Sequence, residues 1–107
     1  MISDFNLNEI SNGLNWYLID HFNSFAVIRI NEEDKTYTLN IVIDLSNIKN
    51  KDIKKRINKI KDLFDNYFGL SNKGIKGQVN SISALVYKGL TEEDLLNINT
   101  LCKMMKG

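Results

Sequence analysis

The sequence predicts an α+β fold, with a small sheet of three antiparallel strands and helices packed on it. Three observations predict this class. The chain has 107 residues, the size of one domain spanning residues 1–107. Apolar residues recur at helical spacing in three segments, alternate with polar residues in two shorter ones, and form one short continuous run. The chain has no proline and one cysteine, so an internal disulfide is impossible.

The first predicted helix begins after Asn6, whose side chain can cap it, and Glu9 completes a capping box. Apolar and aromatic positions at steps of three and four then form one stripe that we expect to be buried: Leu7, Ile10, Leu14, Tyr17, Leu18 and His21. Trp16 lies opposite this stripe, with Phe5 and Ile19 roughly on its side. A helix that is apolar on both sides is either enclosed in the core or faces a partner. Phe5, Trp16 and Ile19 are therefore a possible apolar interface.

Two strands are predicted next, over residues 25–30 and 36–45. The first is a short apolar run, and the second alternates strictly between apolar and polar positions. The polar segment 31–35 between them predicts a β-hairpin. Because the first strand is apolar on nearly both faces, we expect it at the centre of the sheet.

The second half of the chain predicts a helix over residues 50–68, ended by Gly69, then a loop over 70–77. A third strand is predicted over 78–88, and a last helix follows Thr91, which can cap it. The element order is α-β-β-α-β-α. The helical crossover makes the third strand parallel to the second. If it docks beside the first strand, the sheet is fully antiparallel in order 2-1-3.

Charge and composition favour a cytoplasmic protein. The net charge is only +1, so the overall field predicts neither a polyanionic nor a membrane partner. No apolar run approaches the roughly 20 residues that span a bilayer. The first residues do not resemble a signal peptide. The abundance of Ile, Asn and Lys indicates an AT-rich genome, such as that of a low-GC bacterium or its phage.

The sequence offers little for catalysis, so we expect no enzyme, no cofactor and no metal. The single histidine, His21, falls on the predicted buried stripe, and the single cysteine, Cys102, resembles a small core residue. One His and one Cys do not make a usual zinc site. The acidic run 32–34 is contiguous, unlike a calcium loop, and predicts a solvated turn. The glycines lack the spacing of a phosphate-binding loop.

The most informative segment is 49–61, which contains seven cationic side chains and one acid, Asp52. Cations in the first half of a helix oppose its dipole, and unfavourable local choices can mark function. The predicted binding residues for a polyanion or an acidic protein are Lys51, Lys54, Lys55, Arg56 and Lys59. The alternative is an ordinary solvated face in a lysine-rich chain. Arginine, the main reader of base edges, occurs only at positions 29 and 56, which disfavours sequence-specific DNA binding.

These features favour a non-enzymatic protein-binding module that occupies a partner's surface, as small inhibitors, immunity proteins or phage antagonists do. One alternative is an accessory protein that binds nucleic acid nonspecifically through residues 49–61. Another is a homodimeric structural protein that assembles through the first helix or a sheet edge. The sequence identifies neither the partner nor the pathway.

Overall fold

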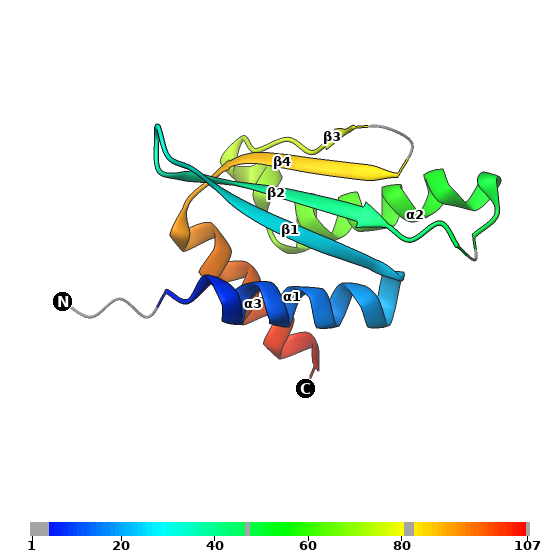
Figure 1. Ribbon diagram of the computed structural model, residues 1–107, viewed down its shortest axis with the longest axis horizontal. Coiled ribbons are helices and arrows are strands. Elements are labelled where there is room, and N and C mark those ends of the chain that lie inside the picture. The colour runs from blue at the N-terminus through cyan, green and yellow to red at the C-terminus, as the bar shows by residue number, and fades with distance from the viewer. Residues whose placement is uncertain (1–4, 47, 81–82, 107) are drawn as a thin grey trace.

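The computed structural model describes residues 5–46, 48–80 and 83–106. Figure 1 shows a four-stranded antiparallel sheet with three α-helices, so the predicted α+β class is confirmed. Helix α1 (Leu7–Phe22) leads into strands β1 (Ser24–Asn31) and β2 (Thr36–Ile43). Helix α2 (Asn50–Asp62) continues into a π turn, η1 (Leu63–Tyr67), and a 3-10 turn, η2 (Leu70–Lys73). Strands β3 (Gln78–Val79) and β4 (Ala84–Leu90) precede helix α3 (Glu92–Lys106).

The helix ends follow the predicted capping, except that the Glu9 carboxylate pairs with Lys103 at 3.1 Å instead of completing a capping box with Asn6. Asn6 caps α1 by accepting a hydrogen bond from the Glu9 N–H at 3.1 Å. Thr91 caps α3, because its hydroxyl accepts from the Asp94 N–H at 3.1 Å while Asp94 accepts from the Thr91 N–H at 2.9 Å. Gly69 has φ 77°, the left-handed conformation expected where a helical segment ends.

The predicted count of three strands and their predicted order are wrong. The observed order is β1-β2-β4-β3, with β2 rather than β1 inside the sheet. The predicted strand over 78–88 is two antiparallel strands, β3 and β4; positions 81 and 82 of that prediction lie outside the described residues. Strand β3 runs parallel to β2, as the crossover rule requires, but β4 turns back and inserts between them.

The sheet has one covered face and one bare face, which explains why the strand order was mispredicted. Residues paired across strands share a face, and Leu39, Ile41 and their partners join a single core with side chains from all three helices. The opposite face carries Phe25 and Val27, which are 43% and 39% exposed. Strand β1 is therefore apolar on both faces without being central. Central β2 alternates because its second face is uncovered.

A β-bulge keeps the end of β4 in the core. Leu39 pairs with Tyr87 but Tyr37 pairs with Leu90, so β4 carries one extra residue at this point. Gly89 has φ 80°, a left-handed value that glycine adopts without steric cost. The extra residue returns the Leu90 side chain to the covered face, where it is fully buried.

Candidate partner-binding surface

Helix α2 lies across the core with one buried stripe and one cationic side. Ile53, Ile57 and Ile60 are at most 5% exposed and face the sheet. Six cations occupy the remaining surface of the helix and its first flanking position, and we call them the basic face: Lys49, Lys51, Lys54, Lys55, Arg56 and Lys59. All are exposed except Arg56, which is half-buried. The structure thus brings the five predicted binding residues onto one surface.

The basic face lacks the acidic partners that four other cations of the described structure have. Lys35, Lys61, Lys73 and Lys103 each form an ion pair, with Glu32, Asp65, Asp94 and Glu9 respectively. Within residues 5–46, 48–80 and 83–106, no side chain of the basic face forms one. Its positive charge is therefore available to an external anion.

A hollow of about 420 Å³ lies beside the basic face, between α2 and the end of α1. Its cationic wall consists of Lys49, Lys55, Arg56 and Lys59, and one acid, Asp52, also lines it. Phe22 and Ile48 add apolar surface to the hollow, and His21 completes the lining. The hollow can accept an acidic group together with part of its hydrocarbon stem.

His21 is not buried as the sequence predicted. Its side chain is 44% exposed, its ring stacks on Tyr17 at a centroid distance of 4.2 Å, and Nδ1 lies 3.1 Å from the Tyr17 carbonyl oxygen. The buried stripe of α1 ends at Tyr17 and Leu18, and His21 in the last turn lies on the rim of the cationic hollow.

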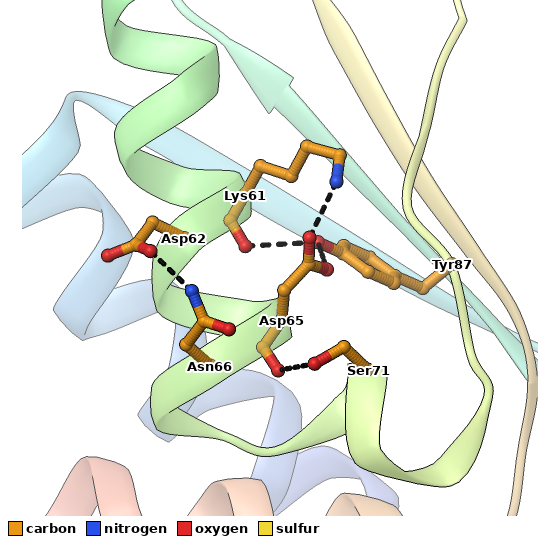
Figure 2. Close-up of polar contacts among 6 residues, drawn as sticks. All are labelled: Lys61, Asp62, Asp65, Asn66, Ser71 and Tyr87. Carbon is orange, nitrogen blue, oxygen red and sulfur yellow. Dashed lines mark hydrogen bonds and ion pairs between the residues drawn. The ribbon is translucent and has the colours of Figure 1, made fainter.

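Lys61 belongs to a structural cluster and not to the basic face. Figure 2 shows its Nζ beside Asp65, at 2.6 Å from Oδ2, while the Tyr87 hydroxyl donates to Asp65 Oδ1 at 2.7 Å. Burial, and then the bond to Asp65, raise the pKa of the Tyr87 phenol well above its ordinary value near 10. The hydroxyl therefore remains a donor and ties the π turn η1 to β4.

The π turn was missed because the sequence pattern there fits an ordinary helix. Five residues, Leu63–Tyr67, adopt the wider turn, and the Phe68 N–H bonds to the Leu63 carbonyl at 2.9 Å. Ser71 Oγ in turn donates to the Asp65 carbonyl at 2.7 Å, visible in Figure 2. The turn aims Asp65 at Tyr87 while Phe64 remains in the core.

The predicted apolar interface on α1 is only partly assembled. Trp16 and Ile19 are 52% and 58% exposed, so enclosure of Trp16 in the core is wrong. Phe5 is half-buried and packs on Tyr37, with ring centroids 5.5 Å apart. Trp16 lines a different hollow, between α1 and α3.

The sheet has a second exposed feature that the sequence did not indicate. Phe25 and Val27 lie on the bare face, with Val42 half-buried beside Phe25 in the paired register. The outer edge of β1 is protected at one point. There Asn15 accepts from the Ala26 N–H at 2.5 Å and donates to the Ala26 carbonyl at 3.0 Å.

Charge is distributed along the long axis of the molecule, which measures 49 Å. Figure 1 places the β1–β2 hairpin and the start of α3 at one end of this axis, and the start of α2 at the other. The first end carries five exposed acidic residues: Glu32, Glu33, Asp34, Glu92 and Glu93. The basic face occupies the second end.

The side chains that could ligate a metal are dispersed over the described part of the chain. No three His, Cys, Asp or Glu side chains in it lie close enough to hold a metal ion. Cys102 is fully buried, as expected for a small core residue. No helix in the same ranges is long and apolar enough to cross a bilayer.

Comparisons with known proteins add no family to this description. No family model, curated protein or solved structure matches the chain.

Proposed function

We propose that the protein is a non-enzymatic binding module that docks on an acidic surface of another protein through its basic face. The observation that carries the proposal is the set of six cations along one helix without acidic partners in the described structure. Natural surfaces usually intersperse both signs, and clustered like charges repel one another. An acidic partner would remove this repulsion and steer association.

Two features favour a protein over a nucleic acid as the partner. The hollow beside α2 includes apolar surface from Phe22 and Ile48, which suits the hydrocarbon part of a Glu or Asp side chain. Five of the six cations are lysines, whereas arginine dominates base readout, so the basic face does not favour sequence-specific recognition of a nucleic acid. The hollow and the lysines together fit carboxylates presented on a folded or extended polypeptide.

The test uses fluorescein-labelled poly-L-glutamate as the acidic probe, with binding followed by fluorescence anisotropy at about 50 mM salt. We expect K54E/K55E to weaken binding by about tenfold or more, since each reversal replaces an attraction by a repulsion. The matched control is K76E/K88E, which makes the same change in net charge at two exposed lysines outside the basic face. It should lower the affinity by no more than about twofold.

Two results would contradict the proposal. One is an equal loss of affinity in both double variants, which would mean that only net charge matters. The other is no binding of poly-L-glutamate by the wild-type protein at about 50 mM salt.

A second candidate is nonspecific nucleic-acid binding, favoured by the placement of five of the six cations along α2 and of the sixth, Lys49, directly before it. A labelled DNA duplex in the same assay tests it. Tighter binding to the duplex than to poly-L-glutamate, with affinity falling by around a thousandfold from about 50 to 200 mM salt, would favour this candidate. Full binding by K54E/K55E would exclude it.

A homodimer is the third candidate, and the bare face of the sheet around Phe25 and Val27 favours it. Light scattering at several protein concentrations tests it. A constant monomer mass would exclude this candidate.

A further inference from the structure

An apolar groove runs along the side of α2 that faces the edge of the sheet. Its volume is about 450 Å³, within the usual range of ligand pockets. Ile53 and Ile57 form its floor, and Val79 of β3 forms the opposite wall. Val79 is 56% exposed, so its side chain is accessible to a ligand in the groove.

The groove adjoins the basic face through two shared residues. Lys54 and Asn58 line the apolar groove, and both also line the shallow, mainly cationic surface formed with Lys51, Lys55, Lys59 and one acid, Asp62. Around the circumference of α2, the apolar floor of the groove is therefore followed by the two shared residues and then by the lysines of the basic face. The two surfaces can be occupied by one ligand that is apolar on one side and acidic on the other.

We infer that the groove and the basic face form one docking site for an acidic polypeptide segment with large apolar side chains, such as Leu, Ile or Phe. This inference rests on the proposed function and adds an apolar anchor to it. The anchor would enter the groove against Ile53, Ile57 and Val79, and flanking carboxylates would meet Lys51, Lys54 and Lys55.

The division of roles follows from the energetics of the two surfaces. Exposed ion pairs typically make only a small contribution to affinity, and salt screens them. Burial of an apolar side chain contributes more and is insensitive to salt. The basic face therefore governs the rate and salt dependence of association, and the groove discriminates between acidic segments.

The experiment selects ligands from a random dodecapeptide library displayed on phage, with the wild-type protein as bait. We expect the enriched peptides to combine an excess of Asp and Glu with at least two large apolar residues. One enriched peptide is then labelled, and its affinity is compared with that of labelled poly-L-glutamate. Val79→Ser should weaken the selected peptide about five- to tenfold and leave poly-L-glutamate unchanged.

Two matched variants separate this inference from the proposed function. Val27→Ser makes the same substitution at an exposed valine of the bare sheet face and should leave both affinities unchanged. K54E/K55E should weaken both probes. If Val79→Ser and Val27→Ser behave alike while K54E/K55E weakens both probes, the groove inference is wrong and the proposed function stands.

The remaining outcomes also distinguish the groove inference from the proposed function of the basic face. Enrichment of apolar peptides without excess acid, or of no peptide, overturns the groove inference, and poly-L-glutamate then reports on the basic face by itself. Loss of peptide binding in Val79→Ser with full binding in K54E/K55E would overturn the proposed function and the acidic part of this inference.

Discussion

At the scale of single residues, Tyr87 makes the most demanding set of contacts. Its side chain is fully buried, its ring stacks on Phe64 at 5.6 Å, and its hydroxyl donates to Asp65. Gly77 lies against the same ring, and an added Cβ there would be 2.6 Å from Tyr87 Cζ. Tyr87 thus holds the π turn through its hydroxyl and contacts, through its ring, the glycine that directly precedes β3.

Tyr87→Phe should lower the free energy of unfolding at pH 7 by about 1.5 to 3 kcal/mol, because it removes a hydrogen bond to a charged group. It should also change how the free energy of unfolding depends on pH above about pH 10. The pKa of Tyr87 is raised in the folded protein, so this residue's contribution is complete below about pH 10 and is lost as pH rises further. The variant should therefore lose less stability than the wild type between about pH 10 and 12.

Urea unfolding followed by circular dichroism at pH 7, 10 and 11 measures both effects. Tyr67→Phe is the control, since the Tyr67 side chain is 48% exposed and the substitution should be nearly neutral. If the variant and the wild type lose the same unfolding free energy between about pH 10 and 11, the pKa of Tyr87 is not raised in the folded protein.

At the scale of elements, α2 combines a favourable buried stripe with an unfavourable charge order. The residue that precedes it, Lys49, makes no side-chain cap. Lys51 sits in the first turn, where the helix dipole favours an acid, and it lies three and four residues before Lys54 and Lys55. A helix selected for stability alone would carry Glu at such a position.

Lys51→Glu should therefore raise the free energy of unfolding by about 0.5 to 1 kcal/mol. It should also weaken binding of poly-L-glutamate, because it places an acid within the basic face. Chemical denaturation and anisotropy on the same sample measure the two effects. Stabilisation without any loss of binding would show that Lys51 lies outside the docking site.

The helices were easier to predict from sequence than the sheet. The caps at Asn6 and Thr91 and the αL glycine at position 69 are local signals, and each is confirmed. The position of β1 was mispredicted because an apolar residue such as Val27 has the same sequence pattern on a bare face as on a covered one. The π turn and the insertion of β4 depend on contacts distant in sequence, such as Tyr87 with Asp65.

The cationic composition of the site was visible in the sequence, but its surroundings were not. The cations of residues 51–59 were identified because they are clustered in a short segment of the sequence. The groove required Val79 to lie beside Ile53 and Ile57, and the hollow required Phe22 and Ile48 beside Arg56. These neighbours come from separate elements, so no local pattern indicated them.

At the scale of the whole molecule, the placement of all helices on one face makes the two sides of the sheet respond differently to substitution. Val27→Ser on the bare face should change the free energy of unfolding by less than about 1 kcal/mol. Leu39→Ala on the covered face should cost about 2 to 5 kcal/mol, since Leu39 is fully buried. Thermal or urea unfolding of the pair gives the comparison, and a large loss from Val27→Ser would mean that this face is covered in solution.

The separation of charge along the 49 Å axis affects the molecule before any contact forms. Because the net charge is only +1, the acids of the hairpin end and the cations of α2 contribute a dipole to the long-range field of the protein. Once a polyanion comes within about a Debye length of the protein, roughly 8 Å at physiological salt, it exerts a torque on this dipole. The torque turns α2 toward the polyanion before the two molecules touch. Most encounters would then begin in a pre-aligned orientation, with the acidic hairpin pointing away into solvent.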